Sequence, residues 1–205
     1  MHRPQFKASV ASRQRGISLI VVMLLLIIAS ILGAGAAQIA SMGERSARNE
    51  RDMQLAWQSA EAALMDAEYD IHGPGTSRNA LLGDVQSTNA FVVGCGSSGT
   101  SKGLCALTET GKPAWLAVTF DDNSSSAKTT AFGDITGRPF AAKADPDDAG
   151  ILPALKPRYI IEPLSDPLNR DKSVSAPPAY IFRVTAMGFG PRKDIQAVSQ
   201  ILYRN

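Results

Sequence analysis

The first part of the chain carries one long apolar segment. Residues 17–40 are interrupted only by two serines, two glycines and one glutamine, and no charged residue occurs between Gly16 and Glu44. As an α-helix this segment would be roughly 36 Å long, whereas the hydrocarbon core of a bilayer is about 30 Å thick. The segment is therefore long enough to span a membrane.

A pattern typical of an amphipathic helix follows. Apolar residues recur every three or four positions, which places them on one face of a helix. They are Met53, Trp57, Ala60, Leu64, Ala67 and Ile71. The other face carries charged and amide side chains, among them Asp66 and Asp70, and is expected to contact water. No proline interrupts the pattern, so it predicts a nearly continuous helix over residues 17–71, with weak points at Gly33 and Gly35.

The remainder of the chain, residues 76–205, has the pattern of a small strand-rich domain. Short apolar or alternating segments are bounded by glycine, proline, asparagine and aspartate, which is typical of strands separated by turns. They are residues 90–93, 115–120, 158–163, 179–187 and 195–203. The last two flank a glycine-containing turn at residues 188–194 and predict a β-hairpin. An antiparallel sheet packed on the amphipathic stripe gives an α+β architecture.

Charge narrows the possible function classes. The chain has 21 basic and 19 acidic residues, a net charge of +2, whereas a nucleic-acid-binding protein carries a clear basic excess on one face. Nucleic acid is therefore not expected as a partner. The basic residues that precede the apolar segment favour a cytoplasmic N-terminus. In a bacterial host, the rest of the chain would then lie outside the inner membrane.

Three interpretations of the N-terminus are open at this point. The first is a secretory signal peptide that is cut at the small residues 34–36. The second is an uncleaved single-pass anchor. The third is a prepilin-type leader over residues 1–16, cut between Gly16 and Ile17, so that the apolar segment becomes the N-terminus of the mature protein. A signal peptide gives no reason for the helical continuity, because its apolar part is discarded.

The inventory of chemically active residues is short. Two cysteines in an exported domain most simply pair, so we predict a disulfide between Cys95 and Cys105. No catalytic residue, cofactor site or metal site is predicted, because His72 is the only histidine beyond the leader and no phosphate-binding loop or Cys-x-x-Cys motif occurs. The acidic clusters at residues 121–123 and 145–148 lack the spacing of a calcium loop and are predicted to be solvated turns.

Two segments of the chain match the pattern of a known family, RQRGISLIVV at residues 13–22 and SAEAALMDAE at residues 59–68. Through them the chain resembles the type IV pilin-like proteins and, among them, the PilX-type minor pilins. The segment YIFRVTAMG at residues 180–188 is similar to a strand near the end of the family's members. The resemblance implies a pilin-like fold, in which a long N-terminal helix packs on a small antiparallel sheet. It also implies a structural subunit and not an enzyme.

The same resemblance implies how the N-terminus is processed and where the protein acts. A prepilin peptidase would cut between Gly16 and Ile17, and Ile17 would be N-methylated. The mature protein would sit in the inner membrane and then in the extracellular pilus, contacting other minor pilins and the major pilin through its N-terminal helix. The family implies a role in priming the filament near its tip, in twitching motility and in adhesion, with a PilY-type adhesin as a further partner.

One residue departs from the common pilin pattern. Most pilins carry glutamate at the fifth residue after the cut, where this chain has Val21. That acid is thought to meet the N-terminal amine of the subunit ahead, and an unpaired acid in lipid costs about 2.5 to 3.5 kcal/mol. A tip subunit has no subunit ahead of it, so Val21 is consistent with a tip or priming role.

The sequence thus predicts a leader at residues 1–16, a membrane-spanning half-helix at residues 17–43, an amphipathic half-helix at residues 44–72 and a strand-rich domain at residues 76–205. One alternative is a GspK-like pseudopilin of type II secretion, which is disfavoured because that family carries a large inserted domain. An alternative of another class is a periplasmic binding domain or enzyme on a signal anchor. It would keep an intact N-terminus or one cut after Ala36.

Overall fold

The computed structural model describes residues 17–76, 78–82, 87–108, 110–145, 147, 149–169 and 178–204. One long helix, α1 (Ile17–His72), is followed by two short helices, α2 (Asn79–Leu82) and α3 (Ala114–Ala117), and by a 3-10 turn at Gly99–Ser101. Four strands complete the fold, β1 (Thr130–Ala131), β2 (Arg158–Ser165), β3 (Tyr180–Phe189) and β4 (Gln196–Tyr203). By its internal contacts the chain divides into two units, Met1–Arg48 and Asn49–Asn205.

The described part of the first unit is helical throughout. Residues 18–48 are all solvent-exposed, including every large apolar side chain. An 18-residue window of this helix has a mean hydropathy of 2.8 and no buried residue. By length and composition it is the only membrane-spanning candidate among the described residues. The predicted weak points, Gly33 and Gly35, lie within α1.

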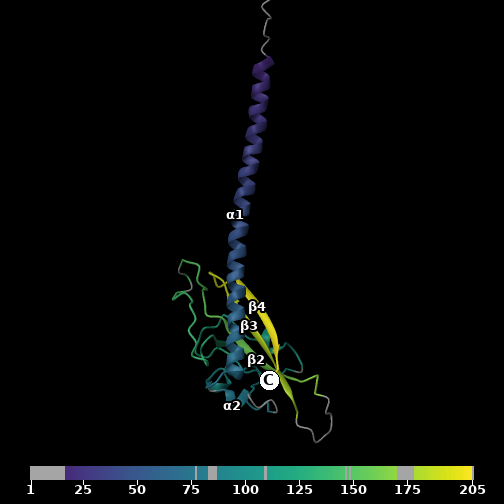
Figure 1. The fold of residues 1–205 in the computed structure, drawn as a ribbon, viewed down its shortest axis with the longest axis vertical. Helices are drawn as coiled ribbons and strands as arrows, with labels where there is room; N and C mark the ends of the chain where they lie inside the picture. The colour runs from purple at the N-terminus through teal and green to yellow at the C-terminus, as the bar shows by residue number, and fades with distance from the viewer. Residues whose placement is uncertain are drawn as a thin grey trace, which may run out of the picture. The chain divides into compact units, whose positions relative to one another are not determined.

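The second unit contains an antiparallel sheet with the strand order β1–β2–β3–β4. Figure 1 shows β2, β3 and β4 beside the C-terminal part of α1. The hairpin joins Phe189 to Gln196, with a hydrogen bond of 2.8 Å from the Gly190 amide to the Ile195 carbonyl closing the turn. The three strands predicted over residues 158–163, 179–187 and 195–203 are confirmed within a few residues.

Two predicted strands are wrong. In residues 90–93, only Val92 forms a bridge, with Cys105. Residues 115–120 overlap the short helix α3, whose extended N-cap is Pro113. A short apolar run does not distinguish a single helical turn from a strand by its pattern alone. Conversely, β1 was not predicted, because two residues are too short to show an alternating pattern.

The core lies between the sheet and the C-terminal part of α1. Small side chains line the helix at this contact, and Ala56, Ala60, Ala63 and Ala67 are each 0% exposed. A β-carbon on Gly188 of β3 would lie 2.2 Å from the carbonyl oxygen of Ala56 and 2.2 Å from the amide nitrogen of Ala60. The backbones therefore approach too closely for any side chain at position 188.

The predicted stripe needs one correction on its apolar side. Trp57 is 45% exposed, whereas the neighbouring Ala56 is fully buried. A large indole would hold the sheet away from the helix, so the alanine positions take the contact and the buried face is rotated relative to the prediction. The rest of the core is conventional, with Leu64 and Ile71 packed among Phe91, Tyr159 and Phe182.

Candidate assembly surface and buried polar centre

The first candidate functional feature is the exposed apolar half of α1. We call residues 18–43 the assembly segment. Its side chains point to all sides of the helix, and it contains no charged residue. Exposed apolar surface of this extent normally marks a membrane or protein contact. The first charged residue beyond it, Glu44, forms an exposed ion pair with Arg48 one helical turn further on, with an N···O distance of 2.5 Å.

The sequence-predicted residues of this segment are placed as follows. Ile17 is the first residue of α1, whereas Gly16 and the rest of the leader lie outside the described residues. Val21 is 49% exposed. A β-carbon on Gly33 or Gly35 would meet no atom within 4 Å. These glycines thus leave a smooth surface on which another helix can approach closely.

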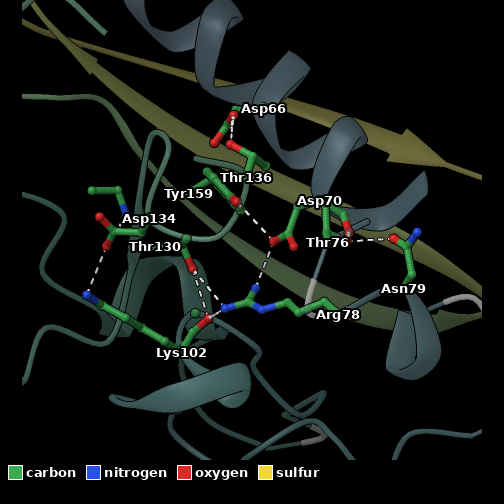
Figure 2. Close-up of polar contacts among 12 residues, drawn as sticks. Asp66, Asp70, Thr76, Arg78, Asn79, Lys102, Thr130, Asp134, Thr136 and Tyr159 are labelled. Atoms are coloured by element: carbon green, nitrogen blue, oxygen red, sulfur yellow. Dashed lines mark hydrogen bonds and ion pairs between the residues drawn. The ribbon is translucent and has the colours of Figure 1, made fainter. Parts of the chain in front are cut away.

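The second feature is a polar centre beneath the C-terminal part of α1, formed by Asp66, Asp70, Arg78, Thr136 and Tyr159. Figure 2 shows these side chains gathered between the helix, the strand β2 and the surrounding loops. Both aspartates are 0% exposed. Their predicted place on a water-facing side of the helix is therefore wrong, because each finds buried hydrogen-bond donors.

Asp70 is held by one charged and one neutral donor. Its Oδ2 atom accepts hydrogen bonds of 2.9 Å from Nη1 of Arg78 and of 2.9 Å from the hydroxyl of Tyr159. Arg78 is also fully buried, and its other terminal nitrogen donates to the carbonyl oxygen of Lys102. That carbonyl also accepts a hydrogen bond of 2.8 Å from Thr130 of β1. The pair thus joins α1, β2 and the loop before β1.

Asp66 secures the loop that follows β1. Its Oδ2 accepts a 2.9 Å hydrogen bond from the Gly133 amide, and its Oδ1 accepts one of 2.6 Å from the Thr136 hydroxyl. Arg138, which lies 3.6 Å from Oδ1, adds a partly exposed positive charge. A buried carboxylate is tolerated only when such donors replace the lost water.

Burial dominates the electrostatics of the polar centre. It raises the pKa of Asp70 from 3.8 to about 6, since desolvation outweighs the opposing effects of Arg78 and of the Tyr159 hydrogen bond. Oδ1 of Asp70 has no hydrogen-bond partner among the described residues, which accounts for this imbalance. Burial, reinforced by the Asp70 charge, raises the pKa of the Tyr159 hydroxyl well above its usual value. The hydroxyl therefore acts as a donor at any physiological pH.

A disulfide closes the loop that contains Lys102. Cys95 and Cys105 are bonded, with an Sγ–Sγ distance of 2.01 Å, and both are buried. The amide of Cys105 donates to the carbonyl of Ile161 and the amide of Ile161 donates to the carbonyl of Gly103, each at 2.9 Å. The disulfide loop is thereby fixed along the strand β2.

The polar centre connects α1 to β2 and to the loops around it. Among the described residues there is no cluster of three or more histidine, cysteine or acidic side chains that could hold a metal ion. In the two acidic segments, a carboxylate oxygen of Asp122 accepts a hydrogen bond from the amide of Ser124, and one of Asp145 accepts a hydrogen bond from the amide of Asp147, as in ordinary turns. Part of the second segment, at residues 146 and 148, lies outside the described residues.

Sequence reasoning missed the polar centre, although one signal was present. Asp66 and Asp70 each lie three positions after a buried alanine, Ala63 and Ala67, so they adjoin the buried face of α1. Their partners come from residues 78, 133, 136 and 159, which show no periodic pattern of their own.

The fold and the assembly segment define a class, the α+β pilin-like proteins. The PilX N-terminal family matches residues 15–64, and the C-terminal family of the type IV pilus assembly protein PilX matches residues 101–205. The chain belongs to the PilX family, which makes it a minor pilin of the type IV pilus. Members of these families are structural components that interact with other pilus components. Neither the curated proteins nor the solved structures gave a match.

Proposed function

We propose that this minor pilin takes part in assembling and priming the type IV pilus at or near the filament tip. In that position it would support twitching motility and adhesion. It acts as a structural subunit and not as an enzyme. The observation that carries the proposal is the assembly segment, a fully exposed apolar half-helix that lacks the acid at residue 21 and belongs to a PilX-family chain.

We further propose that prepilin peptidase removes residues 1–16 and that Ile17 is then N-methylated. Support comes from the family match, which begins at residue 15 and so includes Gly16 and Ile17. Cleavage there leaves the whole apolar segment on the mature chain, whereas a signal peptidase would discard it. Residues 17–43 would then cross the inner membrane once with a cytoplasmic N-terminus, before their transfer into the extracellular pilus.

The assembly segment is the surface that we propose for other minor pilins and for the major pilin. Its side chains are apolar all round, so they can leave lipid and enter a bundle of helices with little change of environment. The domain at residues 76–205 would face outward, where a PilY-type adhesin is the expected further partner.

Mass spectrometry of the N-terminal peptide from native membranes tests the processing step. We expect a peptide that begins with N-methylated Ile17. A mature chain that begins at Met1 or at Ala37 would contradict both the cleavage and the pilin role. The same spectra of a Gly16→Leu variant should show the uncut chain, because peptidase cleavage needs the small residue.

A substitution at Val21 tests the tip position. If the subunit has no neighbour ahead of it, Val21→Glu adds an unpaired acid to the apolar segment at a cost of about 2.5 to 3.5 kcal/mol. Incorporation into sheared pili, measured by immunoblot, should then stay the same or fall. A clear gain in incorporation would place the chain inside the filament. Val21→Leu is the matched control, since it keeps the segment apolar.

A further inference from the structure

The outer edge of strand β4 has no partner strand in the part of the chain that the structure describes. β4 pairs with β3 on one side and is the last strand of the sheet (Figure 1). The opposite edge is closed by the chain itself. There β1 pairs with β2, and the disulfide loop exchanges two hydrogen bonds of 2.9 Å with Ile161. Among the described strands, β4 therefore leaves one edge of the sheet open.

The register shows which backbone groups lie on this open edge. The Gly190 amide donates to the Ile195 carbonyl, so these two residues form a hydrogen-bonded pair at the start of the ladder. Such pairs occur at every second position of an antiparallel ladder, so every second residue of β4 directs its amide and carbonyl away from β3. We call these outward backbone groups the free edge; they belong to Gln196, Val198, Gln200 and Leu202.

β4 lacks the features by which proteins normally protect an open edge. Charged residues, prolines, bulges or a very short strand usually prevent such an edge from pairing with another chain. β4 has eight residues and pairs with β3 without a bulge, and its sequence QAVSQILY contains no charge, proline or glycine. Val198 is 43% exposed and Leu202 is 64% exposed. This combination indicates a surface that another chain covers.

A groove lies beside the C-terminal end of the free edge. It has a volume of about 530 Å³ and is lined by Pro167, Leu168, Ile181, Leu202, Tyr203 and Arg204. Five of these side chains are apolar or aromatic, and the sixth, Arg204, forms an ion pair of 2.6 Å with Asp166. The groove therefore suits an apolar side chain. When a strand is added to a sheet, backbone hydrogen bonds supply the affinity and such pockets supply the specificity.

We propose that the free edge binds an extended, uncharged segment of another pilus component, which adds a strand to the sheet beside β4. Outward amide and carbonyl groups repeat at every second residue, roughly 7 Å apart, and an extended backbone matches this spacing. The residues of the added strand that lie opposite Val198 and Leu202 share their face of the sheet, so we expect them to be apolar. The one opposite Leu202 lies beside the groove.

A second copy of this chain is a less suitable occupant of the free edge. The second half of α1 runs in the same direction as β4. At the start of β4, a β-carbon on Gly190 would lie 2.8 Å from the Asp52 carbonyl oxygen, and at its end the rings of His72 and Tyr203 are 5.2 Å apart. Antiparallel pairing of two β4 strands would thus set their α1 helices in opposite directions. This argument rests on the single-pass insertion proposed above, which gives all copies in one membrane the same direction.

Photo-crosslinking in intact, piliated cells of the native host identifies what covers the free edge. The photoreactive amino acid p-benzoylphenylalanine is placed at position 200 of the full-length chain, and crosslinked peptides are identified by mass spectrometry. We expect a crosslink to an uncharged segment of another pilus component with apolar residues at alternate positions. The same label at position 93, where Val93 is 89% exposed just before the disulfide loop, is the control and should not give this product. No crosslink from position 200, a crosslink to a highly charged segment or a crosslink to a second copy of this chain would overturn the proposal.

Substitutions at Val198 test whether the contact is a backbone pairing. Val198→Pro removes an outward amide, and because that amide does not bond to β3 the fold is retained. Val198→Lys keeps the amide and adds the kind of charge that protects natural edges. Each should lower the crosslink yield from position 200 at least about fivefold, as expected when a backbone hydrogen bond or an apolar contact is lost.

Two controls keep this test specific. Val93→Lys makes the same change at an exposed valine away from β4 and should leave the yield from position 200 unchanged. Immunoblots of the membrane fraction show whether all variants are present in equal amounts. The N-terminal peptide in the same digests reports leader cleavage, so a failure of processing and a failure of strand pairing give different results. If Val198→Pro left the crosslink yield unchanged, strand addition at β4 would be refuted.

Discussion

The two halves of α1 obey different rules although they form one helix. In the first half every large apolar side chain is exposed, whereas in the second half it is alanines and two aspartates that are fully buried. Residue type alone therefore does not predict burial in this chain. The first half exposes its apolar surface, which can contact lipid or other helices. The second half buries two charged side chains, Asp66 and Asp70.

The difference has a simple physical origin. A helix that is apolar all round has no preferred face toward its own domain, so it is stabilised by an external apolar environment. The second half offers a face of small residues, which permits close approach of β3 and brings hydrogen-bond donors to Asp66 and Asp70. A substitution in one half of α1 should therefore change the stability through that half alone.

The largest effect is expected from breaking the buried ion pair. Arg78→Met leaves the Asp70 carboxylate buried without its charged partner and should lower the free energy of unfolding by about 3 to 5 kcal/mol. Chemical denaturation followed by tryptophan fluorescence measures this loss. The double variant Asp70→Leu/Arg78→Met should recover a large part of it, because no charge is left buried.

An exposed pair provides the control for this experiment. Arg192 and Asp194 form an ion pair whose side chains are 72% and 60% exposed. Arg192→Met should therefore change the stability by less than about 1 kcal/mol. If it cost as much as Arg78→Met, burial would not be the cause of the difference.

Two glycine-to-alanine substitutions compare the two halves of α1, because each adds only one methyl group. Gly188→Ala places a β-carbon 2.2 Å from backbone atoms of α1, so strand and helix must separate, at a cost of about 3 kcal/mol. Gly35→Ala meets no atom within 4 Å and should stabilise the helix by up to about 1 kcal/mol. Thermal unfolding and helical circular dichroism of both variants measure these effects. A stability loss in Gly35→Ala equal to that of Gly188→Ala would show that the first half is packed.

The disulfide tests whether stability in the second unit can be lowered without touching the assembly segment. It closes a loop with a sequence separation of 10, which corresponds to roughly 2.5 to 3 kcal/mol. The double variant Cys95→Ser/Cys105→Ser should lose about that amount, whereas its fraction in the membrane should be unchanged. If membrane association were lost together with stability, the assembly segment would depend on the folding of the second unit. Substituting both cysteines avoids a free thiol that could form an intermolecular disulfide.

Features that repeat at a regular spacing in the sequence could be predicted, whereas contacts between residues far apart in the sequence could not. The helix and the strands β2 to β4 were predictable because apolar residues repeat at regular spacing, and the disulfide because only two cysteines occur. The burial of Asp70 was not predictable, since its partner Tyr159 lies 89 positions away. The exposure of Trp57 likewise depends on how closely β3 approaches, which is set by Gly188 and not by the helix itself.

The smallest of the expected stability losses is the pH dependence that comes from Asp70. Its pKa of about 6 in the folded protein lies above the unfolded value of 3.8, so the folded state holds this proton over a window in which the unfolded state has lost it. The contribution of Asp70 to the free energy of unfolding is fully present below about pH 4 and is lost as the pH rises through 6. From pH 4.5 to pH 7 the loss amounts to about 2 kcal/mol.

Asp70→Asn tests this contribution, because every other ionisable side chain is present in both proteins. The stability difference, wild type minus variant, should fall by about 2 kcal/mol between pH 4.5 and pH 7. Glu61→Gln, which removes an exposed acid from the same helix, is the matched control for the loss of one acidic side chain. A difference for Asp70→Asn that rises with pH would mean that Arg78 and Tyr159 outweigh desolvation, since a lowered pKa reverses the sign. The experiment therefore decides whether the second half of α1 tolerates its buried charge or is held in place by it.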